Sequence, residues 1–172
     1  MELTPAELTV LGLVIERPSH GYDLEQVIER RGIRQWTEIG FSSIYYLLAK
    51  LEKRGFVHAA RATSPAKSRR VFHATDEGER AAARDAAAYI AEPLAVAQPL
   101  LVGIANLPLL TERQYARALR TRLATIEARI AAVAEAQRSP APLPAREVFS
   151  YSLSLMEAER SWLAARVGGS GA

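Results

Sequence analysis

Apolar side chains return every three or four residues along several stretches of the N-terminal third, which is the spacing of amphipathic helices. The first stretch predicts a helix over residues 5–16, which Pro18 brings to an end. The second predicts a helix that opens at Ser19 and stops at Gly32. The apolar faces of these two helices are formed by Leu8, Leu11, Ile15, Leu24, Val27 and Ile28.

The stretch from residue 40 to residue 70 predicts a third helix that leads directly into a β-hairpin. Gly55 ends the helix, since glycine readily takes the left-handed conformation found at helix C-termini. Residues 56–63 and 69–75 are expected to form two strands on either side of a polar turn at residues 64–68. The buried face of the helix is formed by Ile44, Leu47, Leu48 and Leu51.

A short link of residues 33–39 joins the second predicted helix to the third, as a helix-turn-helix requires. Trp36 and Ile39 in this link are expected to fill the small core. Three helices followed by a hairpin outline a winged helix-turn-helix. In such a fold the third helix enters the major groove of DNA, and the hairpin, or wing, lies beside the phosphate backbone.

Basic residues are concentrated in the predicted third helix and wing. The whole chain carries a formal net charge of +3, yet residues 50–70 hold seven basic residues and a single acid, Glu52. The basic residues are Lys50, Lys53, Arg54, Arg61, Lys67, Arg69 and Arg70. A run of charge by itself is more often a solvated face, but its place on a helix and hairpin favours contact with DNA phosphates.

The C-terminal half predicts helices only. Thr75 is expected to cap a helix that runs to about Ala91. Residues 94–107 are apolar on nearly all sides, so they are expected to be buried between the two halves of the chain or between two subunits. After the proline-rich residues 139–144, a last helix is expected over residues 145–167.

A long helix is expected between these segments, from its cap at Thr111 to about Arg138. Its apolar residues are spaced alternately four and three positions apart, which is a heptad seam. The seam consists of Leu119, Leu123, Ile126, Ile130 and Val133. Such a seam pairs with another helix, and the sequence leaves open whether that helix belongs to the same chain or to a second copy.

Three strings of the N-terminal half resemble the PadR family of bacterial transcriptional regulators. They are HGYDL at residues 20–24, SSIYYLLAKLEKRGFV at residues 42–57 and RRVFHATDEG at residues 69–78. The chain departs from the family pattern at Phe41-Ser42, where Pro-Gly is frequent, and at Phe72, where Tyr is common. The resemblance covers roughly residues 5–80 and continues more weakly into the C-terminal half, where the larger members carry a helical dimerisation region.

Pattern and resemblance together predict a mainly α fold with a small β-hairpin. We expect an N-terminal winged helix-turn-helix domain over residues 1–80, a helical dimerisation or effector domain over residues 81–167 and a flexible tail over residues 168–172. The resemblance implies a cytoplasmic, sequence-specific DNA-binding transcriptional regulator. Repression is expected because a bound dimer can act by occluding a promoter.

Two related alternatives remain beside this interpretation. A winged-helix module can bind protein rather than DNA, but such a module has no need of a basic wing. A MarR-like regulator also carries a winged helix, but the C-terminal position of all the predicted dimer helices favours the PadR type.

Residues for DNA contact are expected on the second helix, the third helix and the wing, where small polar, aromatic and basic side chains can approach bases and phosphates. The candidates are His20, Tyr22, Ser42, Ser43, Tyr45, Tyr46, Lys50, Lys67, Arg69 and Arg70. Two alternatives stay open. Core packing explains Tyr22 equally well, and Tyr45 either donates to a phosphate or packs its ring under the helix.

A single small module binds DNA weakly, so we expect a homodimer on a palindromic operator in double-stranded DNA. Candidate dimer contacts are Leu119, Leu123, Ile126, Ile130, Val133, Met156, Trp162 and Leu163. Some PadR relatives respond to phenolic acids or hydrophobic drugs, so the resemblance implies a small hydrophobic or aromatic effector. Its candidate pocket residues are Tyr89, Phe149, Tyr151, Met156 and Trp162, although each alone is better explained as core.

Catalysis and metal binding find little support in the sequence. The absence of cysteine excludes disulfides, thiol nucleophiles and cysteine-based zinc sites. His20, His58 and His73 lack the spacing of a metal motif, although His58 and His73 are expected to face each other across the hairpin. We therefore expect no enzyme activity, cofactor or metal. We also expect no membrane segment, because the apolar residues 94–110 are too short and too interrupted to span a bilayer.

Overall fold

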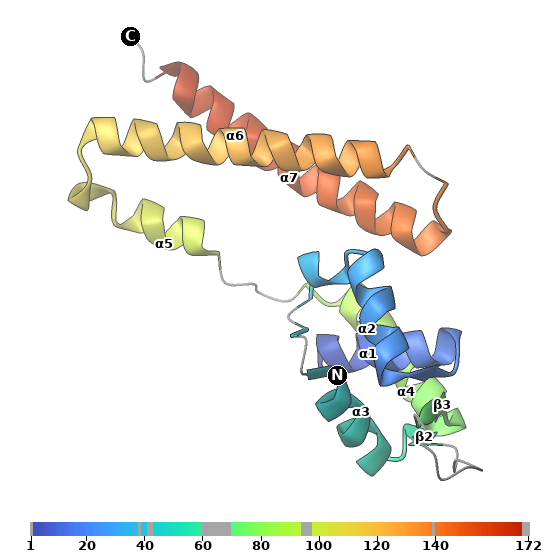
Figure 1. The fold of residues 1–172 in the computed structure, drawn as a ribbon. Coiled ribbons are helices and arrows are strands. Elements are labelled where there is room, and N and C mark those ends of the chain that lie inside the picture. The colour runs from blue at the N-terminus through green and yellow to red at the C-terminus, as the bar shows by residue number, and fades with distance from the viewer. Residues whose placement is uncertain are drawn as a thin grey trace. The chain divides into compact units, whose positions relative to one another are not determined.

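The computed structural model describes residues 2–37, 39–40, 43–59, 70–93, 98–138 and 140–169. The chain is mainly helical with one small antiparallel sheet, as the sequence predicts (Figure 1). It consists of two compact units, Met1–Val96 and Ala97–Ala172, and each is described by itself.

The first unit holds the predicted helix-turn-helix and wing. Its elements are α1 (Pro5–Glu16), β1 (Ser19–His20), α2 (Gly21–Arg30), the 3-10 helix η1 (Ile33–Gln35), α3 (Ser43–Lys53), β2 (Val57–Ala59), β3 (Val71–Ala74) and α4 (Asp76–Ala91). Helix α1 begins in a capping box: the Glu7 N–H donates to Thr4 Oγ1 at 3.3 Å, and the Thr4 N–H donates to Glu7 Oε2 at 2.9 Å. Thr75 caps α4, as expected, by accepting from the Gly78 N–H at 3.1 Å.

The three strands form an antiparallel sheet in the order β1-β3-β2. The rings of His58 and His73 stack across the wing with their centres 5.4 Å apart, so these residues are the cross-strand neighbours that the sequence predicts. Strand β1, where Ser19 lies opposite Phe72, is not predicted, because two residues are too few to show a strand periodicity. The remainder of the expected wing, residues 60–69, lies outside the described residues.

One hydrophobic core joins the helices of the first unit to the sheet. It is formed by Leu3, Val10, Leu11, Leu13, Val14, Leu24, Ile28, Ile33, Ile39, Ile44, Leu47, Leu48, Leu51, Phe56, Val57, Phe72, Ala81 and Ala82. Ile39 is 3% exposed, as expected, but Trp36 is 54% exposed, so the prediction that Trp36 fills the core is wrong. Ile33 of η1 enters the core instead, and the indole is left at the surface.

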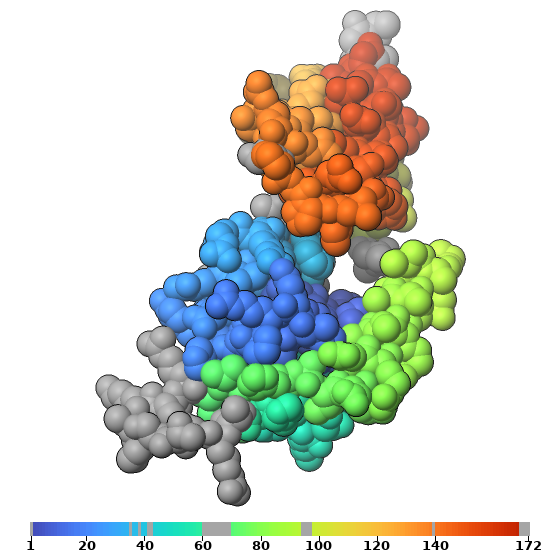
Figure 2. Space-filling view, turned by 90° about the vertical axis from the view of Figure 1, so that its right-hand side faces the viewer, coloured from blue at the N-terminus to red at the C-terminus, as the bar shows by residue number. Residues whose placement is uncertain are grey.

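Helix α4 packs on α1, and Figure 2 shows it as a green band against the blue of α1. It belongs to the first unit, whereas the sequence suggests a boundary at residue 80. The first turn of α4 lies against the start of the wing, since the Thr75 N–H donates to the Phe56 carbonyl at 3.0 Å. A Cβ at Gly78 would lie 2.1 Å from the same carbonyl oxygen, so this close approach requires glycine.

The second unit is entirely helical within its described residues: α5 (Pro99–Ala105), the 3-10 helix η2 (Leu107–Leu109), α6 (Glu112–Ala136) and α7 (Leu143–Gly169). Helices α6 and α7 lie side by side (Figure 1). Their contact buries Leu119, Ile126 and Leu163, and it is flanked by the partly buried Tyr115, Leu123, Ile130, Met156, Trp162 and Val167. Most of the heptad seam of α6 therefore pairs with α7 of the same chain.

Helix α5 is exposed within the second unit. It has no buried residue in the described chain, and Leu101 and Val102 are 59% and 66% exposed, so burial of residues 94–107 between the two halves or between two subunits stays a prediction. A helix that is apolar on nearly all sides needs cover on more than one side, and α6 borders it on one. No helix that the structure describes is both long and apolar enough to cross a membrane.

We predict that Gly78→Ala destabilises the protein by about 1–3 kcal/mol, because the new methyl group is forced against the Phe56 carbonyl. The matched control is Gly12→Ala in α1, where a Cβ meets nothing within 4 Å. This control should instead stabilise the protein by about 0.5–1 kcal/mol, since alanine is the better helix former. Urea unfolding followed by circular dichroism measures both effects, and equal stability of the two variants would contradict the close approach.

Candidate nucleic-acid interface

Helix α3 has one face in the core and one face in solvent. Its buried face is formed by Ile44, Leu47, Leu48 and Leu51, as the sequence predicts. Tyr45 and Tyr46 on the other side are 57% and 68% exposed, and Ala49 and Lys53 are exposed with them. Large aromatic side chains left in water beside a basic residue form a surface that can meet both base edges and phosphates.

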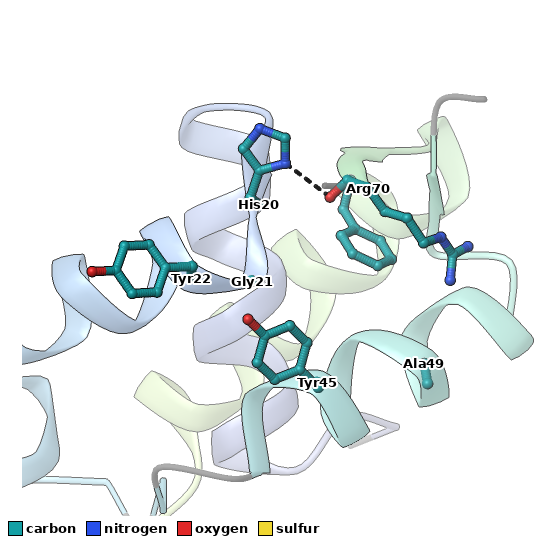
Figure 3. Close-up of a pocket in the computed structure, with 7 residues that line it drawn as sticks. His20, Gly21, Tyr22, Tyr45, Ala49 and Arg70 are labelled. Carbon is teal, nitrogen blue, oxygen red and sulfur yellow. Dashed lines mark hydrogen bonds between the residues drawn. The ribbon is translucent and has the colours of Figure 1, made fainter. Parts of the chain in front are cut away.

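A cavity of about 440 Å³ opens beside this exposed face and gathers residues from four elements. It is lined by His20, Gly21, Tyr22, Tyr45, Ala49, Arg70 and Phe72 (Figure 3). The two phenols and the guanidinium carry hydrogen-bond donors, which is the chemistry that binds phosphate oxygens. The cavity thus brings together four of the predicted DNA-contact residues from α2, α3 and the wing strands.

Tyr45 owes its position to the glycine that begins α2. A Cβ at Gly21 would lie 2.6 Å from Cε1 of Tyr45, so the phenol ring packs directly on the Gly21 backbone. Figure 3 shows the ring rising from α3 toward this point. The two alternatives for Tyr45 are therefore compatible, because the ring packs on α2 while the residue keeps 57% of its surface exposed at the cavity.

His20 is held against the wing. Its Nδ1 lies 3.1 Å from the carbonyl oxygen of Arg70 (Figure 3). Because a carbonyl oxygen only accepts, Nδ1 is the atom that carries the hydrogen. The other ring nitrogen then accepts in the neutral imidazole, and His20 donates to a phosphate through it only when the ring is protonated.

Several of the basic residues near α3 are held by acids of the first unit. Lys50 Nζ lies 3.0 Å from Glu7 Oε1, on the side of α3 that faces α1. Arg54 is 3.3 Å from the same oxygen. Arg70 pairs with Glu52 at 2.5 Å. The assignment of Lys50 to DNA contact stays a prediction, and the structure points to a residue that the sequence analysis leaves aside, the exposed Lys53.

Glu7 and Asp85 are buried carboxylates that remain charged. Glu7 is 1% exposed, and burial alone would raise its pKa. The hydrogen bonds from the Thr4 N–H and from Lys50 outweigh that effect and hold the pKa of Glu7 below its usual value. Asp85 is 3% exposed, and the hydrogen bond from the Leu3 N–H lowers its pKa against the opposing effect of burial.

The structure constrains the roles of the other predicted DNA-contact residues less closely. Ser42, Lys67 and Arg69 lie outside the described residues. The Ser43 hydroxyl donates to the Gly40 carbonyl at 2.6 Å at the start of α3, so it is used locally in the free protein. Tyr22 is 48% exposed, which favours a surface role over simple core packing.

The predicted dimer contacts lie on α6 and α7. Leu119, Ile126 and Leu163 are buried within the chain, and Leu123, Ile130, Met156 and Trp162 pack against them. That they also contact a second copy stays a prediction. A sequence cannot distinguish these two roles, because the heptad spacing that makes an intersubunit seam also makes an intrachain one.

The predicted effector residues are divided between the two units, so a common pocket stays a prediction. The Tyr89 hydroxyl donates to the Leu3 carbonyl at 2.9 Å within the first unit, whereas Phe149, Tyr151, Met156 and Trp162 are on α7 of the second. A cavity of about 660 Å³ does lie within the second unit, between α5 and α6, and none of the five predicted residues lines it. The described residues also contain no group of three or more potential metal ligands.

The elements of the two units define a fold, a winged helix-turn-helix followed by a helical C-terminal region. The sequence model described as the transcriptional regulator PadR-like family matches residues 10–84. Residues 10–84 are therefore similar to this family. No curated protein is similar enough in sequence to count as a match.

Solved structures extend the likeness over the whole chain. PadR of Bacillus subtilis in complex with operator DNA has a TM-score of 0.79 and 17% identity, with 97% of this chain and 99% of that chain covered. The same protein in complex with p-coumaric acid has a TM-score of 0.80 and 16% identity over 96% and 98% of the two chains. The PadR-like regulator BC1756 of Bacillus cereus has a TM-score of 0.70 and 18% identity over 95% and 96%. At these identities the likeness establishes the fold.

We predict that acid destabilises the protein through its buried carboxylates. The folded-state pKa values of Glu7 and Asp85 lie below their usual, unfolded-state values. Their contribution to stability is therefore complete above the unfolded pKa and is lost as the pH falls through the folded pKa, roughly from pH 5 downward. Asp85→Asn should flatten the decline of the unfolding free energy between about pH 5 and pH 3, as measured by urea denaturation.

The control for this experiment is Glu79→Gln, which changes an exposed carboxylate of α4. It should leave the pH dependence as it is in the unmodified protein. A decline that is equally steep in both variants would show that Asp85 makes no such contribution.

Proposed function

We propose that the chain is a sequence-specific transcriptional regulator that binds double-stranded DNA as a homodimer, represses transcription and responds to a small hydrophobic or aromatic effector. The observation that carries the proposal is the exposed face of α3, with the donor-lined cavity of His20, Tyr22, Tyr45 and Arg70 directly beside it.

In this proposal α3 enters the major groove. Tyr46, Ala49 and Lys53 then face base edges and flanking phosphates, since they form the exposed side of the helix. The cavity residues lie on the neighbouring strands and on α2, where they would take the phosphate backbone at the edge of the groove. The similar fold of Bacillus subtilis PadR in complex with operator DNA supports this placement.

Exposed apolar surface on the second unit supports a dimer. Val148, Tyr151 and Leu155 of α7 are 37%, 67% and 56% exposed, and their spacing of three and four residues places them in one stripe. Helix α5 also leaves its apolar side chains exposed. A second copy of the chain would remove such surface from water, and a two-fold dimer would match a palindromic operator.

The cavity of the second unit is suited to an amphipathic effector. Its volume of about 660 Å³ lies within the range of small-molecule sites. It is lined by apolar side chains of α5 and η2, among them Ile104 and Leu107, and by Arg117 and Arg129 of α6. This combination fits an aromatic or aliphatic carboxylate, and the similar fold of Bacillus subtilis PadR is known in complex with p-coumaric acid. Repression then follows from promoter occupancy by the dimer in the cytoplasm, and an effector would alter that occupancy.

We predict that Arg70→Gln weakens binding to the DNA upstream of the chain's own gene by about tenfold at low salt. It should also reduce the slope of log affinity against log salt concentration by the amount expected for the loss of about one phosphate contact. Tyr46→Ala should instead reduce the preference for that DNA over unrelated DNA, with little change in the salt dependence. Fluorescence anisotropy at two salt concentrations measures both effects.

The matched control is Arg138→Gln, which removes an exposed arginine from its ion pair with Glu135 in the second unit. It should bind as the unmodified protein does. If all DNA is bound equally and neither Arg70→Gln nor Tyr46→Ala changes binding, the nucleic-acid interface is wrongly placed and a protein-binding winged helix becomes the better interpretation.

We predict that Leu155→Glu converts the dimer to monomers at micromolar concentration, because it places a charge in the exposed apolar stripe of α7. Ala164→Glu is the control, since Ala164 is exposed and lies nine residues further, half a turn around the helix. Light scattering coupled to size-exclusion chromatography distinguishes the two masses. A dimer that survives Leu155→Glu unchanged would exclude the stripe as the interface.

A further inference from the structure

Residues Glu2 and Leu3, which we call the N-terminal clasp, are anchored on α4. Asp85 Oδ2 accepts hydrogen bonds from the Glu2 N–H at 2.7 Å and from the Leu3 N–H at 2.5 Å. The Tyr89 hydroxyl donates to the Leu3 carbonyl at 2.9 Å. Leu3 and Asp85 are 2% and 3% exposed, so this anchor is buried and its polar groups are paired.

The same clasp reaches the C-terminal end of α3. Arg54, which directly follows α3, donates from Nη2 to the Glu2 carbonyl at 3.1 Å and to Glu2 Oε1 at 3.0 Å. The other carboxylate oxygen of Glu2, Oε2, accepts from Arg84 Nη2 of α4 at 2.9 Å. One carboxylate therefore holds a guanidinium from the end of α3 and another from α4.

The geometry makes this contact stronger than an isolated surface ion pair. Such a pair contributes little, because two long side chains must be ordered for it. Here the backbone of Glu2 is already fixed by Asp85, and Arg54 is fixed a second time by Glu7 at 3.3 Å. Several charges on pre-ordered side chains form a network rather than a pair, so its members act together.

We infer that Glu2 is a positioning residue for DNA recognition: it fixes the end of α3 relative to α4, the helix from which the chain continues into the second unit. This inference rests on the proposed function, because it concerns how α3 is presented to DNA.

The direction of the change in DNA affinity distinguishes a positioning role of Glu2 from a purely electrostatic one. Glu2→Gln removes a negative charge, which by electrostatics alone would strengthen binding to DNA. If Glu2 positions α3, the same variant weakens DNA binding, by about threefold or more. Glu77→Gln is the matched control, because it removes an exposed acid from an ion pair in the first turn of α4 and leaves the clasp intact.

Arg84→Gln removes the partner of Glu2 on α4. Its control is Arg80→Gln, which makes the same change one turn away, in the ion pair with Glu77. Arg84→Gln should weaken DNA binding more than Arg80→Gln does. The double variant Glu2→Gln/Arg84→Gln should bind no more weakly than the weaker single variant, because both changes break one connection. Tighter binding by Glu2→Gln, or fully additive effects, would overturn the inference.

Hydrogen exchange in the absence of DNA provides a readout that does not depend on the proposed function. Glu2→Gln should increase exchange of the amides in the last turn of α3, near Leu51 and Lys53, whereas Glu77→Gln should not. A change in exchange without any specific DNA binding by the unmodified protein would uphold the clasp and reject the proposed function. Unchanged exchange together with normal DNA binding by Glu2→Gln would reject the clasp alone.

Discussion

A carboxylate that is removed from water has to find its partners inside the protein, and in the first unit Glu7 finds three, Thr4, Lys50 and Arg54. It completes the capping box that starts α1, and it receives Lys50 of α3 and Arg54 just beyond that helix. A buried charge left without its partners costs several kcal/mol, by the measure of about 3–5 kcal/mol for broken buried pairs. The start of α1 and the end of α3 are therefore fixed together. The rotation of α3 about its axis decides which side chains meet DNA, so the exposed face of Tyr46 and Lys53 depends on this interaction.

The same ion pairs change how the basic charge of the chain is understood. Counting residues along the sequence treats every lysine and arginine near α3 as available to phosphate. In the folded protein Lys50 and Arg54 neutralise Glu7, and Arg70 meets Glu52. Among the residues that the structure describes, the surface offered to DNA therefore has aromatic and hydroxyl groups beside basic side chains that already have acidic partners. Such a surface favours recognition by shape and hydrogen bonding over attraction by charge alone.

The parts of the fold that follow from a regular pattern were predictable. The faces of α1 and α3, the cap at Thr75 and the pairing of His58 with His73 all depend on residues close in sequence or on a simple register. Strand β1 was not predictable, because it forms only by pairing with β3, which is distant in the sequence. The surface position of Trp36 was not predictable either, because it depends on which apolar side chain of the link packs into the core. The partners of Lys50 and the choice of α7 as the partner of the α6 seam likewise arise only when the chain has folded.

The exposure of α5 has a consequence for how the protein folds and assembles. It is seven residues long and has no buried side chain in the described chain, and isolated helices of this length are unstable in water. The helix is then stable only when another part of the protein covers it. In a homodimer, the folding of this segment would therefore be coupled to the association of the two chains. Stability would rise with protein concentration. The newly made chain would be most prone to aggregation in the interval before it meets its partner.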